Sequence, residues 1–79
     1  MPLQLDIVTP EKNLYSGPAD MVVVPAVEGE MGIMPMHIPL MTALNPGQIA
    51  VTKDGKTDYL AINGGFVEVT ASSVTIITH

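Results

Sequence analysis

Residues 48–62 have the sequence QIAVTKDGKTDYLAI, and this stretch decides the class of fold. Asp54-Gly55 at its centre is a pair that type I′ hairpin turns favour, because both central residues of that turn need a positive φ. The pairs that a turn there aligns are Lys53 with Lys56, Val51 with Asp58 and Ile49 with Leu60. The apolar residues that then share one face are Ile49, Val51, Leu60 and Ile62. The stretch therefore predicts an antiparallel hairpin with one buried face.

The remainder of the chain also favours strands over helices. Seven prolines and seven glycines interrupt the sequence, and before Gly65 no stretch free of both exceeds eight residues. A stable helix usually needs about 10–12 residues. The one longer window, residues 66–79, is rich in Val, Ile and Thr, whose branched side chains fit a pleated strand better than a helix. We therefore expect an all-β fold.

Several short segments can supply the other strands. Leu3, Leu5 and Ile7 alternate with polar residues, which is the period of a half-buried strand. The other expected strands lie at residues 14–16, 20–24, 40–44, 66–70 and 74–78, with a short extended piece near Ile33. The expected turns and breaks lie at residues 9–13, 17–18, 45–47, 63–65 and 71–73. About ten short strands in one domain, residues 1–79, predict a small β-sandwich or flattened barrel.

Composition excludes several classes of protein. Three lysines, no arginine and eight acidic residues give a formal net charge of −5, so nucleic acid and anionic lipid, which need clustered positive charge, are not expected partners. The absence of cysteine removes disulfides and thiolate metal sites. No apolar run approaches the ~20 residues of a membrane span, so no direct membrane insertion is expected. The start, MPLQLDIV, has no basic stretch before an apolar block, which favours the cytoplasm or a mature organellar chain over secretion.

The chain offers little for catalysis. His37 has Glu28 and Glu30 as its nearest carboxylates in sequence, and a histidine with two acids can form a metal or acid–base site. A loop histidine that meets a partner surface is the commoner situation. No serine has the surroundings of an activated nucleophile, and no glycine cluster forms a phosphate-binding loop. We expect neither an enzyme nor a bound metal or cofactor.

Two other binding functions stay open on the residues alone. Met31, Met34, Met36 and Met41 surround His37 in sequence, and thioether with imidazole is a soft ligand set that suits Cu(I). Methionine also serves as adaptable packing. Lys53 and Lys56 flank a hairpin tip, as the modified lysine does in biotinyl and lipoyl carrier domains. Here the neighbours of the lysines are Thr, Asp and Gly rather than methionine, which favours two solvated lysines.

Residues 26–44 form a loop-rich segment that is long for so small a domain. Long irregular segments usually carry function. Acidic residues lie here beside flexible apolar ones, which is a composition suited to a docking edge. The same apolar side chains could instead close the core, and the sequence leaves both interpretations open.

Residues 28–47, EGEMGIMPMHIPLMTALNPG, carry a resemblance to a known family. They match the pattern EGE-x-GI-x-PGH-x-PL-x-T-x-L-x-PG of the epsilon subunit of F-type rotary ATP synthases, which is called delta in mitochondria. Residues 3–17 resemble the opening strands of its N-terminal β-sandwich domain, NGGFVEV at 63–69 is similar to its SGGFVEV strand, and VTIIT at 74–78 to its last sandwich strand. Met36 stands where the family usually has glycine, and Ile38 where it usually has a small residue.

The resemblance implies a non-catalytic rotor subunit of the central stalk. Such a subunit binds the gamma subunit and the polar loops of the c-ring, and helps to couple ion-driven rotation to ATP synthesis in other subunits. By position, the residues implied on the c-ring side are Glu28, Glu30 and Met31, and those on the gamma side are Thr9, His37 and Met41. The implied location is peripheral, on the cytoplasmic face of a bacterial inner membrane or the equivalent organellar face.

Family members generally continue into two C-terminal helices that regulate ATP hydrolysis and in some members bind ATP. The sequence ends at His79, after the last sandwich strand, so no C-terminal helical hairpin is expected. The resemblance therefore implies neither inhibition nor nucleotide binding for these residues.

Overall fold

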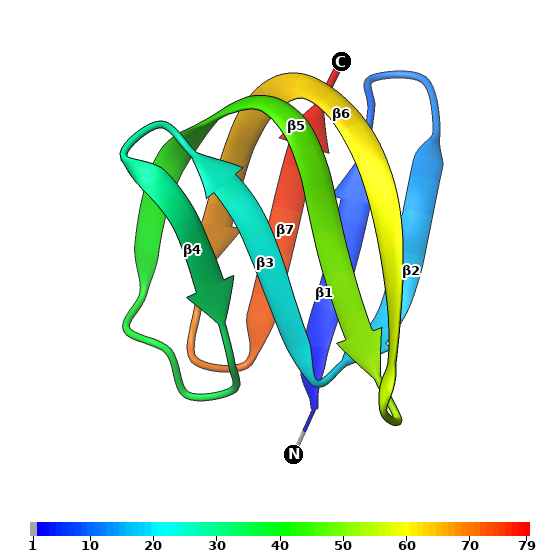
Figure 1. Cartoon of the computed structure of the whole chain (residues 1–79), viewed down its shortest axis with the longest axis vertical. Helices are drawn as coiled ribbons and strands as arrows, with labels where there is room; N and C mark the ends of the chain where they lie inside the picture. The colour runs from blue at the N-terminus through cyan, green and yellow to red at the C-terminus, as the bar shows by residue number, and fades with distance from the viewer. Residues whose placement is uncertain (1) are drawn as a thin grey trace.

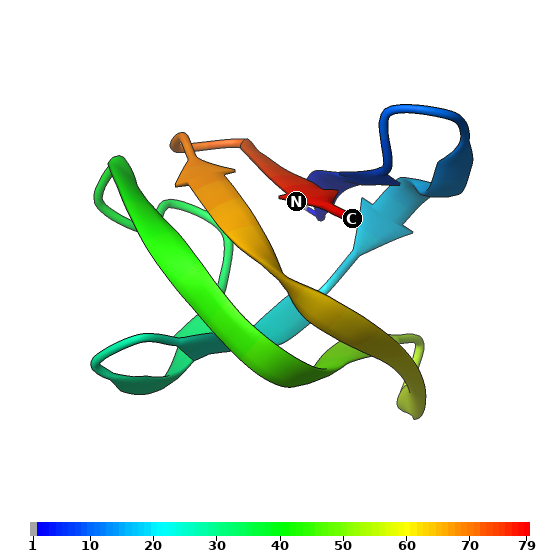
Figure 2. The same cartoon turned by 90° about the horizontal axis from the view of Figure 1, so that it is seen from above.

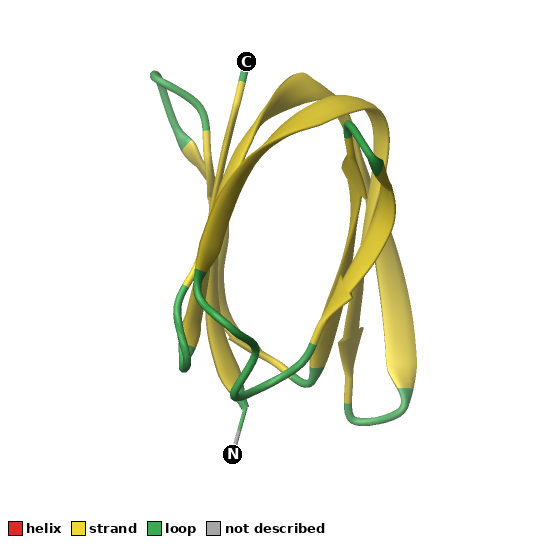
Figure 3. Ribbon diagram, turned by 90° about the vertical axis from the view of Figure 1, so that its left-hand side faces the viewer, coloured by secondary structure: helices red, strands yellow, loops and turns green. Residues whose placement is uncertain are grey.

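The computed structural model describes residues 2–79, which form seven strands and no helix. The strands are β1 (Leu3–Val8), β2 (Asn13–Ala19), β3 (Met21–Ala26), β4 (Gly29–Ile33), β5 (Leu40–Lys53), β6 (Lys56–Val69) and β7 (Ser73–Thr78). They are hydrogen-bonded in the order β2-β1-β7-β6-β5-β3-β4, and the sheet curls into a flattened barrel (Figures 1 and 3). The all-β prediction is confirmed. Among the described residues there is no helix that could cross a membrane.

The central hairpin has the predicted turn and register. Asp54 and Gly55 have φ values of 52° and 78°, as the two central residues of a type I′ turn require. The observed pairs include Lys53 with Lys56, Val51 with Asp58 and Ile49 with Leu60. In addition, the amide of Asp54 donates a 2.9 Å hydrogen bond to the carboxylate of Asp20, which fixes the tip against the β2–β3 turn.

Strand length differs from the prediction, which was about ten short strands. Residues 45–47 lie inside β5 and residues 63–65 lie inside β6, although both triplets were expected to break their strands. The two 14-residue strands bend together at these triplets, so they stay paired on both sides of the bend, Leu44 with Gly65 and Pro46 with Asn63. Gly17-Pro18 likewise lies inside β2 rather than in a turn. An edge strand tolerates proline because its outer N–H needs no partner.

The bend divides the barrel into two layers (Figure 2). The first half of β5 and the second half of β6 continue the layer of β7, β1 and β2, whereas the second half of β5 pairs with β3 in the other layer. Apolar residues from both layers alternate inward and form one core. The expected face of the hairpin is confirmed, since Ile49, Val51 and Ile62 are buried and Leu60 packs against the core.

Two glycines allow β6 to pass the end of β7 at this bend. Gly64 and Gly65 have φ values of 94° and 141°, in the region that side chains disfavour. A side chain at position 65 would collide with the backbone carbonyl of Ile77. The hydroxyl of Thr78 is buried and donates a 2.6 Å hydrogen bond to the carbonyl oxygen of Gly64. The close approach of β6 to the end of β7 therefore depends on the absence of a side chain at position 65.

Replacing Gly65 by alanine tests this closure. We expect Gly65→Ala to lower the free energy of unfolding by about 3 kcal/mol or more, because backbone strain and a backbone collision add. Gly32→Ala is the matched control, since a Cβ at position 32 meets nothing within 4 Å and its φ is not positive. Urea unfolding followed by circular dichroism measures both. Equal stability of the two variants would contradict this account.

Candidate functional site

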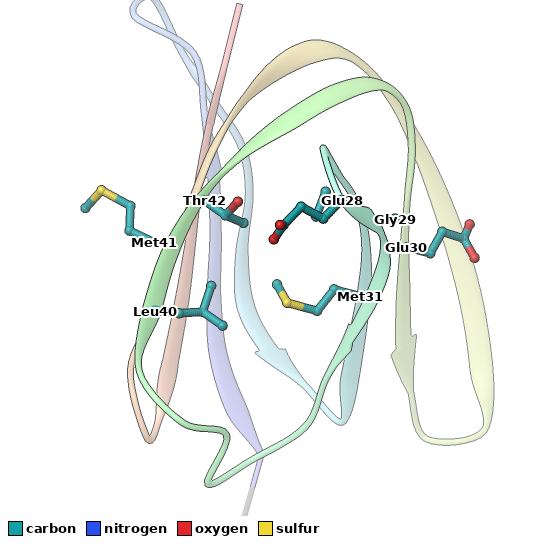
Figure 4. Close-up of a pocket in the computed structure, with 8 residues that line it drawn as sticks. Glu28, Gly29, Glu30, Met31, Leu40, Met41 and Thr42 are labelled. Atoms are coloured by element: carbon teal, nitrogen blue, oxygen red, sulfur yellow. The ribbon is translucent and has the colours of Figure 1, made fainter.

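The β3–β4 hairpin carries the acidic residues singled out in the sequence. Glu28 lies in the turn, and Glu30 and Met31 lie on β4. Neighbouring side chains on a strand point to opposite faces, which separates Glu30 from Met31, whereas Glu28 precedes the strand. Figure 4 shows Glu28 and Met31 pointing inward toward β5, whereas Glu30 points away from the molecule. Both carboxylates belong to exposed residues. The three residues expected on one side thus divide between two directions.

A notch separates this hairpin from the start of β5. The pairing of β3 with β5 shifts register between Val23 and Ala26, so the first residues of β5 diverge from β3. A 3.1 Å hydrogen bond from the amide of Val27 to the carbonyl oxygen of Ala43 closes one end. The notch has a volume of about 370 Å³. Its lining residues are Ala26, Glu28, Gly29, Glu30, Met31, Leu40, Met41 and Thr42.

The outer face of the layer that contains β7 carries a row of exposed apolar side chains. Met41, Phe66 and Ile77 are 68%, 57% and 51% exposed. Phe66 is the cross-strand partner of Ile77, which pairs in turn with Val8 at the end of β1. With Glu68, the cross-strand partner of Met41, these side chains line a hollow of about 300 Å³. We call Met41, Phe66 and Ile77 the outer apolar face.

Phe66 and Ile77 were not among the residues proposed from the sequence. The signal was present, because Val67, Val69, Val74 and Ile76 are buried. In strands with a period of two, their sequence neighbours must point outward. An aromatic residue on the outward side of a strand is a candidate for partner contact. Of the outer apolar face, only Met41 was implied from the sequence.

Thr9 and His37 lie at opposite ends of this layer. Thr9 directly follows Val8, and its hydroxyl accepts a 3.0 Å hydrogen bond from the amide of Lys12, so it holds the β1–β2 turn. His37 lies in the loop between β4 and β5, four residues before Met41. Its Nδ1 is 2.8 Å from the carbonyl oxygen of Ile38. A carbonyl can only accept, so Nδ1 carries the proton and Nε2 is the nitrogen left for a partner.

The residues considered for metal binding do not converge. Residues 2–79 contain no group of three histidine, cysteine or acidic side chains placed to hold a metal ion, so His37 does not form such a group with Glu28 and Glu30. Met31 and Met41 point to opposite sides of β5 (Figure 4). The four methionines of the suggested copper set therefore do not share one site.

The loop that follows β4 contains a strained residue. Met36 has a φ of 69°, which costs a non-glycine residue roughly 1–2 kcal/mol. Its amide donates a 2.8 Å hydrogen bond to the carbonyl oxygen of Ala71, and this bond fixes the loop against the β6–β7 turn. The side chain of Met36 is 81% exposed, and that of Ile38 is 78% exposed. The loop thus presents apolar side chains to solvent on a strained backbone.

Comparison with known proteins gives a consistent result. Residues 2–79 match the family described as the ATP synthase delta/epsilon chain, β-sandwich domain. The chain is 48% identical over 77 residues to the ATP synthase epsilon chain of Maricaulis maris and 49% identical to that of Herpetosiphon aurantiacus. It covers 58% and 57% of those two proteins, and 98% of its own length is matched in each case. The chain therefore spans somewhat over half the length of these curated relatives.

Solved structures show the same fold. A chain in the Euglena gracilis mitochondrial ATP synthase, determined with OSCP, F1 and c-ring in rotational state 1, superposes with a TM-score of 0.91 at 29% identity. The match covers 98% of this chain and 50% of that one. A chain in the Tetrahymena thermophila central stalk and c-ring assembly superposes with a TM-score of 0.80 at 17% identity, and covers 99% and 63%. The second likeness concerns the fold alone.

The strain at Met36 predicts an unusual response to glycine. We expect Met36→Gly to leave the free energy of unfolding unchanged or to raise it by up to about 1 kcal/mol, because relief of the positive φ offsets the flexibility that glycine adds to the unfolded chain. Met34→Gly is the control, since Met34 is also exposed but has no positive φ. It should lose about 0.5–1 kcal/mol. Urea unfolding decides, and a larger loss for Met36→Gly than for Met34→Gly would refute the strain.

Proposed function

Because the chain belongs to the family of ATP synthase delta/epsilon chain β-sandwich domains, we propose that it acts as a non-catalytic part of the rotor of an F-type ATP synthase. In this role it binds the gamma subunit and the polar loops of the c-ring, and turns with them. It thereby helps to couple ion flow to ATP synthesis in other subunits. The observation that carries the proposal is the family match over residues 2–79.

The outer apolar face supports contact with gamma. Exposed aromatic and aliphatic side chains on adjacent strands give a surface that gains free energy when a partner removes it from water. Phe66 lies between Met41 and Ile77 in the hollow, where a buried aromatic anchor contributes most to affinity. Thr9 and His37 lie near the two ends of the same layer. The gamma side is therefore proposed to be this layer, with Phe66 at its centre.

Glu30 supports contact with the c-ring. It points away from the body of the molecule on the edge strand β4 (Figure 4). The single ion pair among residues 2–79 joins Lys53 and Asp54, so the charge of Glu30 has no internal partner. An exposed charge of this kind improves the rate and specificity of binding more than the total affinity. A basic polar loop of the c-ring is a suitable complement.

The barrel suits a part that must hold two partners in a fixed relation. β5 and β6 run through both layers, so a displacement of one layer strains a continuous ladder of backbone hydrogen bonds. Densely packed interiors also deform little. The proposed gamma and c-ring surfaces are thus linked by a stiff body. The location that follows is peripheral, on the cytoplasmic face of a bacterial inner membrane or its organellar equivalent.

Retention of the chain by immobilised gamma and by isolated c-rings tests the proposal. We expect both to retain the chain, and we expect Phe66→Glu to weaken retention by gamma at least about tenfold, because it places a charge in the centre of an apolar contact. Tyr59→Glu is the matched control, since Tyr59 is an exposed aromatic residue on the first half of β6. If neither partner retains the parent chain, the proposed function is wrong.

Charge reversal at Glu30 tests the c-ring side separately. We expect Glu30→Lys to weaken association with the c-ring about three- to tenfold at low salt, with a smaller effect at high salt where exposed charges are screened. Stability should stay unchanged because the side chain is exposed. Surface plasmon resonance at two salt concentrations measures this. Unaltered binding would remove Glu30 from the interface.

A further inference from the structure

Two glutamates line the notch between β4 and β5, but only Glu28 directs its carboxylate into the space, beside apolar side chains. Figure 4 shows the carboxylate of Glu28, the thioether of Met31 and the side chains of Leu40 and Thr42 directed into the same space. The volume of about 370 Å³ is at the lower end of the range of about 300–1,000 Å³ for small ligand pockets. The notch therefore has room for a single side chain of a partner.

Within residues 2–79, Glu28 forms no ion pair with a lysine. The three lysines lie on the β1–β2 turn and at the β5–β6 turn, and the only ion pair within residues 2–79 is that of Lys53 with Asp54. The net charge of −5 adds to the negative potential at Glu28. A group that enters the notch is favoured if it is positively charged at its end and apolar along its length.

We propose that this notch receives an arginine side chain of a partner polypeptide, with the guanidinium against the Glu28 carboxylate and the methylene stem between Met31 and Leu40. The hydroxyl of Thr42 is a further acceptor for a guanidinium N–H. That the partner is a neighbouring rotor subunit rests on the proposed function, whereas the arginine preference of the notch rests on its own lining.

Arginine fits this lining better than lysine. A guanidinium presents a planar set of five donors, so it can bond a carboxylate with two parallel hydrogen bonds and still reach a hydroxyl. It is also more weakly hydrated than an ammonium group, so it enters a half-apolar slot at a smaller desolvation cost. The polarisable sulfur of Met31 adapts to the shape of the entering stem.

The proposed arginine site is distinct from the contact assigned to Glu30. Glu28 and Glu30 are two residues apart, but one faces the notch and the other faces away from the molecule (Figure 4). A general acidic loop would use both carboxylates alike. A built arginine site depends on Glu28, whose carboxylate enters the notch, more than on Glu30.

Titration of the ¹⁵N-labelled chain with N-acetyl-arginine amide tests the proposal directly. We expect saturable amide shift changes centred on Glu28, Met31 and Thr42, and much weaker changes with N-acetyl-citrulline amide, its uncharged counterpart. Glu28→Gln should weaken binding of the arginine probe about threefold to fivefold, the scale of a partly exposed charge pair. The matched variant Glu11→Gln, at an exposed glutamate on the β1–β2 turn outside the notch, should change it less than about twofold.

Two guanidinium probes of different length test the apolar part of the notch. Butylguanidinium should bind at least about threefold more tightly than methylguanidinium, because its extra methylene groups are removed from water. Equal weakening by Glu28→Gln and Glu11→Gln, equal binding of the citrulline probe, or shift changes spread over all acidic residues would overturn the inference. Loss of retention by gamma and the c-ring with intact arginine binding would instead refute only the proposed function.

Discussion

The close approach of β6 to the end of β7 is the constraint on which the rest of the structure depends. At Gly64-Gly65, β6 can bend over the edge of the barrel and stay hydrogen-bonded to β7, because the glycines place no side chain between these two strands. β5 follows the bend through residues 45–47, so one hairpin belongs to both layers. Closure of the core between the layers then follows from ordinary strand alternation.

This shared hairpin also places the candidate surfaces. The first half of β5 presents Met41 to the outside and Leu40 to the notch, so one strand borders both the outer apolar face and the slot beside Glu28 (Figure 4). Residues of the proposed gamma and c-ring contacts are therefore fixed relative to each other by a few residues of backbone. In the rotor role proposed above, such short and stiff connections are an advantage.

Much of the site could be predicted only through the family resemblance. The resemblance of residues 28–47 to the family implied Glu30 and Met41 as contact residues, and these contacts are proposals. Strand alternation could also have identified Phe66 and Ile77 as outward-pointing apolar residues, since the pattern of their sequence neighbours predicts a buried face. The opposite directions of Glu28 and Glu30 depend on where β4 begins, and Gly29 between them gives no local signal of that boundary. The notch itself depends on the shifted register between β3 and β5, which no local pattern encodes.

By itself, the sequence determined the all-β class, the type I′ turn at Asp54-Gly55, the register of the central hairpin and the inward faces of its strands. These features depend on φ preferences and on neighbours two residues apart, so a short window contains them. Only the tertiary structure decided that residues 45–47 and 63–65 continue their strands. A glycine pair permits either the end of a strand or a bend within it. The contacts that select the bend come from Ile77 and Thr78, which lie more than ten residues after the glycines in the sequence.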